Sequence, residues 1–568
     1  MHEIKLFIES LFGGGMSLLV CFYTFMTALF SSLIMVPFLR TWALSRDTVD
    51  VPDARKVHTT PTPRLGGIAI FLAFLISAQT FVPMEPVVRG ILVGGLIIFL
   101  TGLVDDLHGI SAKHKFIGEI VACLATISIG QVWLSNLGNL FGFGEIMLPV
   151  WIGIPFTVFA VVGVINAINL IDGLDGLAGG VSVIALCALL LMGVIDGDPS
   201  TVLLSAALLG AVIGFLKYNF YPARIFMGDV GSLSVGFLLG FLAVHITQRS
   251  GSTISPMVPI VILGLPILDT LRVMARRILN HTSPFTPDQN HVHHKLLDYG
   301  FEHRLTVLIL YTLTLFWACF AVLFRQWPEY LLLLSLALIS TGAHQVLRYI
   351  LKHKERFSFT QRDSNVGLRQ SALFQQSSGW IDQLMPLVSV LLGIYLLMSL
   401  VSFGTTRVVS WQILIGLLVG SLVLYVRAHS TAHQEFLLLV VYLVGFIAAY
   451  QVWSTTGLSL FGLSLKRCGD LLLLAMAVVV ALKLLLHRPG ELYLSTPDYL
   501  ALGLCVFLAI ASGKTVLNLN LGGPLLRAVI LMVALRTVIT HNAINHRYAV
   551  IGALALLGLA TGVGLLGG

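Results

Sequence analysis

The sequence predicts an all-α, polytopic integral membrane protein. Of its 568 residues, 57% are hydrophobic and only 11% are charged, whereas soluble domains carry about 25% charged residues. The mean hydropathy is +0.92, and apolar runs of the roughly 20 residues that a bilayer-spanning helix needs recur along the chain. The net charge of +7 fits loops that face anionic lipid better than it fits nucleic acid.

These runs predict about eleven core transmembrane helices, followed by about seven more. The core spans are expected near residues 14–38, 67–84, 89–105, 116–133, 148–170, 178–195, 201–218, 230–247, 257–275, 304–324 and 328–350. The additional spans are expected near residues 384–402, 408–426, 434–453, 469–487, 498–512, 526–540 and 548–566. The first run has no basic leader and no small-residue cleavage site, so we interpret it as a retained span.

The longest polar stretch divides the chain. We expect a membrane domain over residues 1–350, a cytoplasmic linker over 351–383 and a further membrane domain of unknown function over 384–568. Isolated charges in the last part are interpreted as side chains that reach the membrane interface. These are Arg427, Asp470, Lys483, Lys514, Arg527 and Arg536.

Lys and Arg predict the sidedness of the membrane domain. The loop between Arg40 and Arg64 is rich in both, and such loops stay in the cytoplasm. Counting spans from there places the connections 106–115, 171–177, 219–229 and 276–303 on the cytoplasmic face. Every polar motif discussed below then falls on that face.

The first acidic motif, GLVDDLHGI, places Asp105 and Asp106 at the end of the third span. Adjacent helical residues point about 100° apart, so the two acids do not form one chelating face. One can reach a metal or a substrate, while the other orients a cation or caps a helix. A pair of carboxylates exposed to water at a helix end is the alternative.

The second motif, NAINLIDGLDGLAGG, places amides and acids at intervals of three. If the helix continued through it, these side chains would share one face. Packing explains the glycines but not two amides and two acids in one register, which favours a functional site. The residues concerned are Asn166, Asn169, Asp172 and Asp175.

A third acidic site follows in FMGDVGSL. Asp229 lies in a glycine-flanked turn, a backbone that can approach a phosphate or a metal. Phe226, three residues earlier, offers a flat face to a base or sugar, although anchoring at the membrane interface is the simpler explanation of a single Phe.

Two basic patches complete the set. His-x-His-His in DQNHVHHKLL could bind a transition metal, but the neighbouring cations favour phosphate oxygens instead. For the loop DARKVHTTPTPRLGG, positive-inside topology is the simpler explanation of any single cation. The basic residues of interest are Lys56, His58, Arg64, Arg276, His291, His293, His294 and Lys295.

Acids that can hold Mg²⁺, with bases beside them, suit phosphoryl transfer, whose catalysis is mostly positioning and charge neutralisation. The four motifs, in this order, resemble the polyprenyl-phosphate N-acetylhexosamine-1-phosphate transferases over roughly residues 20–350. The His loop is similar to that of the bacterial undecaprenyl-phosphate branch, which starts O-antigen and related cell-wall polymers. It is less similar to that of the phospho-MurNAc-pentapeptide translocase. Residues 384–568 resemble no family that we recognise.

The resemblance implies transfer of a sugar 1-phosphate, most simply GlcNAc 1-phosphate, from a UDP-N-acetylhexosamine to undecaprenyl phosphate, with release of UMP. It implies an active site on the cytoplasmic face of the bacterial inner membrane, with Mg²⁺, or Mn²⁺, as the cofactor. No nucleic-acid partner is expected, and a homodimer is an open alternative. A transporter or flippase of lipid-linked sugars is the competing function, above all for residues 384–568.

The resemblance also implies roles for single residues. Asp229 would be the main metal ligand, and Phe226 would stack on uracil. Asp105 and Asp106 would assist the acceptor phosphate or the metal. The remaining acids and amides would orient the nucleotide and the metal, the imidazoles would contact the diphosphate or the sugar, and the cations would bind the substrate. They are Asp172, Asp175, Asn166, Asn169, His291, His293, His294, Lys56, His58, Arg64, Arg276 and Lys295. Whether an acid serves as a base stays open, because a phosphate acceptor is already anionic.

Overall fold

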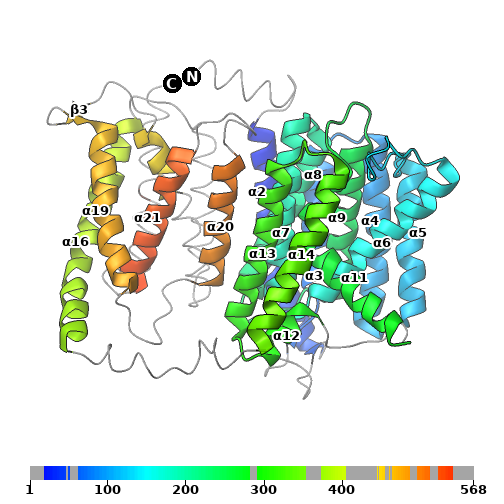
Figure 1. The fold of residues 1–568 in the computed structure, drawn as a ribbon, viewed down its shortest axis with the longest axis horizontal. Coiled ribbons are helices and arrows are strands. Elements are labelled where there is room, and N and C mark those ends of the chain that lie inside the picture. Colours follow the sequence, from blue (N-terminus) through cyan, green and yellow to red (C-terminus); the bar gives the residue numbers. More distant parts are fainter. Residues whose placement is uncertain are drawn as a thin grey trace. The chain divides into compact units, whose positions relative to one another are not determined.

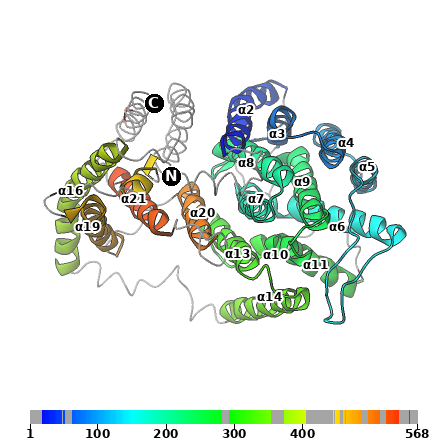
Figure 2. The same ribbon diagram turned by 90° about the horizontal axis from the view of Figure 1, so that it is seen from above.

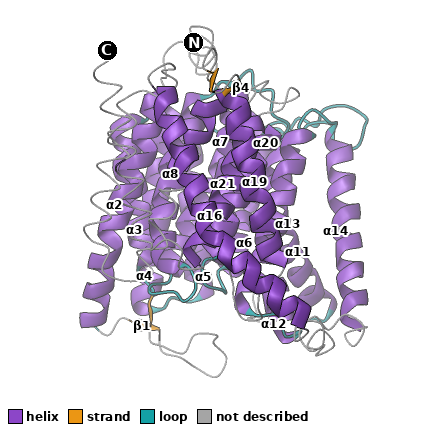
Figure 3. Ribbon diagram, turned by 90° about the vertical axis from the view of Figure 1, so that its left-hand side faces the viewer, coloured by secondary structure: helices purple, strands orange, loops and turns teal. Residues whose placement is uncertain are grey.

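The computed structural model describes residues 18–46, 49–50, 62–281, 291–352, 372–403, 444–445, 447–453, 459–460, 463–485, 495–511, 522–540 and 555. Within these residues, helices dominate and the strands form two short hairpins (Figure 3). The chain divides into two compact units, His2–Leu347 and Arg348–Gly568.

The N-terminal unit is a bundle of helices (Figure 1). Its helices are α2 (Leu18–Ser45), α3 (Gly66–Phe81), α4 (Pro86–His108), α5 (Ala112–Gly130), α6 (Val150–Ile171), α7 (Leu177–Asp196), α8 (Pro199–Asn219), α9 (Gly228–Gln248), α10 (Met257–Ile262), α11 (Gly264–Leu279), α12 (Val292–Asp298), α13 (His303–Leu323) and α14 (Glu329–Lys352), which runs past the unit boundary. Between α2 and α3, β1 (Val49–Asp50) pairs antiparallel with β2 (Thr62–Pro63).

Seven of the described helices are long and apolar enough to cross a membrane, namely the described part of α2 from Val20 onward, α4, α6, α7, α8, α9 and α13. The prediction of an all-α integral membrane protein is thereby confirmed, while the counts of eleven and seven spans stay predictions. The expected span 257–275 is divided into α10 and α11. Pro266 lies in the first turn of α11 and has no N–H to continue the ladder of α10.

The centre of the N-terminal unit consists of α7, α8 and α9. Their side chains are buried along most of their length, and Figure 2 shows the three helices side by side, with α3 and α4 on one side of them and α10 and α13 on the other. Helices without a polar face are the expected occupants of a bundle interior. The ends of these central helices are where the polar motifs emerge.

The C-terminal unit contains α16 (Ala372–Phe403), the hairpin of β3 (Ser459–Leu460) and β4 (Leu463–Ser464), α19 (Leu465–Leu485), α20 (Thr496–Ala511) and α21 (Gly522–Thr540). Helix α16 begins inside the polar stretch expected to be a linker, since ALFQQSS consists mostly of residues that tolerate a helix.

Charges in the C-terminal unit form ion pairs between helices, while their interpretation as side chains that reach the membrane interface stays a prediction. Asp470 of α19 and Arg527 of α21 make a two-pronged pair with N–O distances of 2.7 and 2.9 Å. Arg536 of α21 lies 3.0 Å from Asp498 of α20, and both are buried. These pairs fix α21 against its neighbours. Arg427 and Lys514 lie outside the described residues.

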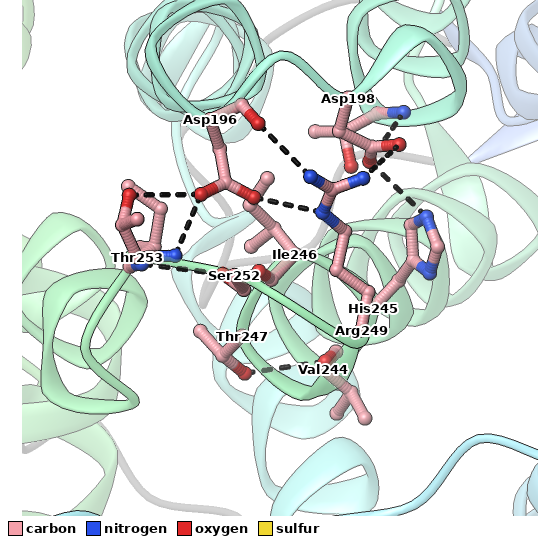
Figure 4. Close-up of polar contacts among 11 residues, drawn as sticks. Asp196, Asp198, Val244, His245, Ile246, Thr247, Arg249, Ser252 and Thr253 are labelled. Atoms are coloured by element: carbon pink, nitrogen blue, oxygen red, sulfur yellow. Dashed lines mark hydrogen bonds and ion pairs between the residues drawn. The ribbon is translucent and has the colours of Figure 1, made fainter.

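A polar network joins the α7–α8 turn to the end of α9 (Figure 4). Asp198 caps α8 by accepting the N–H of Thr201 at 3.1 Å, and its Oδ2 lies 3.1 Å from Nε2 of His245. Arg249 donates through Nε to Asp196 at 2.8 Å and lies 3.7 Å from Asp198. These contacts hold the end of α9 against the α7–α8 turn.

Asp198 precedes the first spanning residue of α8, and its pairing shifts its titration. Burial on its own would raise the pKa of this carboxyl. The contacts with His245 and Thr201 outweigh burial and lower the pKa from 3.8 to about 2. A carboxyl with a lowered folded-state pKa stabilises the fold above its unfolded pKa, and that contribution is lost as the pH falls through the folded value.

We therefore expect Asp198→Asn to lower the free energy of unfolding by about 2 kcal/mol at pH 6. The deficit relative to wild type should shrink between pH 4 and pH 2, where wild-type Asp198 also becomes neutral. Thermal unfolding of detergent-solubilised protein across this range measures it. Asp298→Asn, at an exposed carboxylate of α12, is the control. A deficit of Asp198→Asn that is equally large at pH 2 would contradict the assignment.

Candidate active site

Asp229, in the first turn of α9, is contacted from two other helices. Lys115 of α5 forms an ion pair with its Oδ1, and Asn169 of α6 donates to the same oxygen at 2.7 Å. Lys115 also lies 3.3 Å from Oδ2 of Asp105 at the end of α4. Of the residues that the sequence singled out, Asp105 and Asp229 thus share the ammonium group of Lys115, and Asn169 contacts Asp229.

Asp106 supports the start of α9. Its two oxygens accept the backbone N–H groups of Asp229 and Val230, each at 2.9 Å. Gly228 has a φ of +69°, and a Cβ there would lie 2.6 Å from Asp106 Oδ2, so a larger residue would separate α4 from α9. The sequence left two roles open for the acid pair, metal binding and helix capping. Asp106 caps the start of α9, and its role as a metal ligand stays a prediction.

The α6–α7 turn places its acids differently from the sequence expectation. Helix α6 ends at Ile171, so only Asn166 and Asn169 share its face; the expected alignment of Asp172 and Asp175 with them is wrong. The glycines of the turn allow the chain to leave the helical path.

Asp175 turns away from Asp229 toward the start of α13. Its Oδ2 accepts the N–H of Ala223 at 2.8 Å, and its own N–H donates to Nε2 of His303 at 3.1 Å. The His303 ring stacks on Tyr221, with 4.5 Å between ring centroids. Asp175 is thus engaged in holding the α8–α9 connection, which carries Phe226, against α13.

Asp172 lies just past the spanning part of α6 and titrates unusually. Burial, followed by the negative charges of Asp229, Asp106 and Asp175, raises the pKa of its carboxyl to about 7, against a smaller opposing effect of Arg64. Near neutral pH, Asp172 is thus poised between its charged and neutral forms.

The histidine loop packs against the same turn. His291 Nδ1 lies 2.8 Å from Asp269 of α11, which also accepts the N–H of Val292 at 3.1 Å. These contacts fix the start of α12. His293, the second residue of α12, lies against Gly173, where a Cβ would be only 2.3 Å from Nε2 of His293. The structure therefore brings the histidines to the Asp172 turn.

His293 is neutral near pH 7. Burial, and then the neighbouring His294, lower its pKa to about 3, against the opposing charge of Asp269. Among the described residues, neither of its ring nitrogens has a hydrogen-bond partner. A buried neutral imidazole of this kind can both donate to a ligand and accept from it.

Phe226 connects this end of the bundle with the first basic loop. Its N–H donates to Pro63 at 2.7 Å, and its carbonyl accepts the N–H of Gly66 at 3.0 Å. Arg64 lies between these two residues and is exposed. Lys56 and His58, expected in the same loop, lie outside the described residues.

The remaining predicted cations lie on the α11–α12 side. Arg276 is exposed in the last turn of α11, and Lys295 is half-buried in α12.

Sequence reasoning missed several residues of the site. Lys115 is one of two lysines in AKHKFIGE, four residues before the buried Glu119. Asp269 is an acid within an apolar run. In both cases the signal was a charge at the edge of or inside a predicted span, where ionisable groups are costly and therefore informative.

The fold and the site together define an integral membrane protein with a polar centre, rich in acids and edged by imidazoles and cations, at one end of its helix bundle. The family described as glycosyl transferase family 4 matches residues 88–247, which contain Asp105, Asp172 and Asp229.

Similar proteins point to the same family. A probable undecaprenyl-phosphate N-acetylglucosaminyl 1-phosphate transferase of Bacillus subtilis (strain 168) is 36% identical over 307 residues, which cover 53% of this chain and 84% of the relative. A decaprenyl-phosphate N-acetylglucosaminephosphotransferase of Mycobacterium leprae is 34% identical over a region that covers 47% of this chain and 74% of the relative. The undecaprenyl-phosphate alpha-N-acetylglucosaminyl 1-phosphate transferase of Escherichia coli O157:H7 is 29% identical over a region that covers 58% of this chain and 93% of the relative. The chain belongs to this family of membrane transferases, which confirms the resemblance.

The contact between Gly173 and His293 gives a test of the site's assembly. We expect Gly173→Ala to displace the histidine loop, because the added methyl group overlaps the imidazole. Transferase activity should fall roughly tenfold or more, as misplacement of a positioned group by about 1 Å can cost. Steady-state assays of the purified variant measure this.

Gly163→Ala is the matched control. It adds the same methyl group to α6, where no atom lies within 4 Å of the new Cβ, and should leave the activity unchanged. Equal activities of the two variants would show that His293 contributes nothing through its present position.

Proposed function

We propose that the protein transfers N-acetylglucosamine 1-phosphate from UDP-N-acetylglucosamine to undecaprenyl phosphate and releases UMP. The observation that carries this proposal is that Lys115 and Asn169 both contact Asp229 at the end of apolar helices, while Asp105 contacts the same lysine. A site there meets a water-soluble nucleotide sugar on one side and a lipid phosphate on the other. The printed names of the relatives support the donor sugar and the polyprenyl acceptor.

The reaction needs positioning and charge neutralisation more than covalent help. An oxygen of the acceptor phosphate attacks the phosphorus that carries the sugar. A new P–O–P bridge forms, and the bridge to UMP breaks, with UMP keeping the bonding electrons. Because the attacking phosphate is anionic, no proton has to be removed first. The ammonium of Lys115 can hold phosphate oxygens in line for this exchange.

The histidine loop is suited to the donor's diphosphate or its sugar. His291 is fixed by Asp269, and His293 presents ring nitrogens that are neutral near pH 7. A neutral imidazole can donate a hydrogen bond to a phosphate or sugar oxygen. Phe226, half-buried beside Arg64, offers its ring to uracil, as the family resemblance implies.

The donor atoms fit a divalent cation such as Mg²⁺, although the described residues contain no group of three His, Cys, Asp or Glu side chains arranged for a metal. Mg²⁺ takes oxygen ligands and often uses only one or two carboxylates besides phosphate and water. Asp229 and Asp105 would hold it, with the amide oxygen of Asn169 beside them. When bound, the ion would neutralise the diphosphate.

We further propose that this site faces the cytoplasm at a bacterial inner membrane; the Lys- and Arg-rich loop before α3 supports this sidedness. The product would then begin a cell-surface polysaccharide such as O-antigen or a teichoic acid linkage. A transporter would need ionisable groups near mid-membrane, whereas the charges around Asp229 lie at helix ends, which favours the enzyme.

We expect purified wild-type protein to release UMP from UDP-N-acetylglucosamine when undecaprenyl phosphate and Mg²⁺ are supplied. Asp229→Asn removes one charge from the centre, and activity should fall by about 10²–10³, the usual effect of losing a key electrostatic group. Chelation with EDTA should abolish activity, and added Mg²⁺ should restore it.

Glu145→Gln, at an exposed carboxylate of the α5–α6 connection, is the control and should match wild type. Mass spectrometry of the lipid product from a panel of UDP-N-acetyl sugars identifies the donor. If wild type left every UDP-sugar intact, the proposed function would be wrong.

A further inference from the structure

A carboxylate outside the predicted site ties together the two helices that contact Asp229. Glu119 lies on α5 and is only 1% exposed. Its Oε2 accepts a hydrogen bond from Nδ2 of Asn166 on α6 at 2.8 Å. A carboxylate buried between apolar helices is costly, so a role for it in the site beside it has to be considered.

The contact closes a triangle of helices. Lys115 and Glu119 are four residues apart on α5, and Asn166 and Asn169 are three apart on α6, so the members of each pair share a helix face. Lys115 joins α5 to Asp229 of α9, and Asn169 joins α6 to the same carboxylate. The bond between Glu119 and Asn166 is the third side, one helical turn deeper.

We propose that Glu119 is a positioning residue, which acts through Asn166 to set the spacing of Lys115 and Asn169 around Asp229. This inference rests on the proposed function, because it concerns the geometry of the same reaction. It also reassigns Asn166, which the sequence suggested as a substrate contact. The Asn166 amide donates to Glu119 and to the carbonyl of Val162, at 2.8 and 2.9 Å.

The role needs an acceptor atom at position 119 and no negative charge. A glutamine has the length of glutamate and offers one carbonyl oxygen to Asn166, whereas leucine fills a similar volume and offers none. Glu119→Gln should therefore keep the hydrogen bond to Asn166 that joins α5 to α6, and Glu119→Leu should remove it.

The test compares kcat and KM for UDP-N-acetylglucosamine in the full-length protein. We expect Glu119→Leu to lower kcat roughly tenfold with KM within about twofold, because misplaced groups lose their effect on the reaction more than on binding. Glu119→Gln should retain at least about half of the wild-type kcat. Asn166→Leu should reproduce Glu119→Leu, and the double variant should be no worse than either, as expected of two residues that act through one contact.

Thr126→Val is the matched control for a loss of packing or stability. Thr126 is buried on the same helix but donates to the carbonyls of Gly90, on α4, and Ala122. Its loss should lower the melting temperature without lowering kcat. Glu119→Leu with wild-type kcat, or additive losses in the double variant, would overturn the positioning role. An inactive wild type would instead overturn the proposed function.

Discussion

The charge on Asp229 is the constraint on which the rest of the site depends. A carboxylate at the end of apolar helices must meet a cation or strong donors, because the membrane boundary solvates it poorly. Lys115 and Asn169 supply these from two helices, and Asp106 fixes the backbone beneath it. The approach of α4, α5 and α6 to the start of α9 thus follows from one electrostatic requirement.

The histidine loop depends on the same arrangement. His293 reaches the Asp172 turn because Gly173 has no side chain, and α12 can begin there because Asp269 fixes His291. Acids and imidazoles distant in sequence consequently lie at one end of the bundle. A nucleotide diphosphate can there meet positive and neutral donors together, an arrangement that one helix face does not provide.

Sequence reasoning foresaw the helices and the identity of the polar motifs, because long apolar runs and charges beside them are local signals. It failed where geometry is not periodic. Asp172 and Asp175 seemed to continue the face of Asn169, but α6 ends at Ile171. Lys115 was not among the predicted site residues, because only the folded bundle shows that it contacts Asp229. The pairing of Asp470 with Arg527 was hidden for the same reason.

The two ends of the N-terminal unit show how polar residues of function differ from polar residues of structure. At the far end, Asp196 and Asp198 contact Arg249 and His245 within one network (Figure 4). At the Asp229 end, burial, and then the charges of Asp229, Asp106 and Asp175, raise the pKa of Asp172 to about 7. A carboxyl whose folded-state pKa is raised costs stability when it is ionised. A cationic ligand bound beside Asp172 would reduce this cost, in agreement with the proposed role of this end of the bundle.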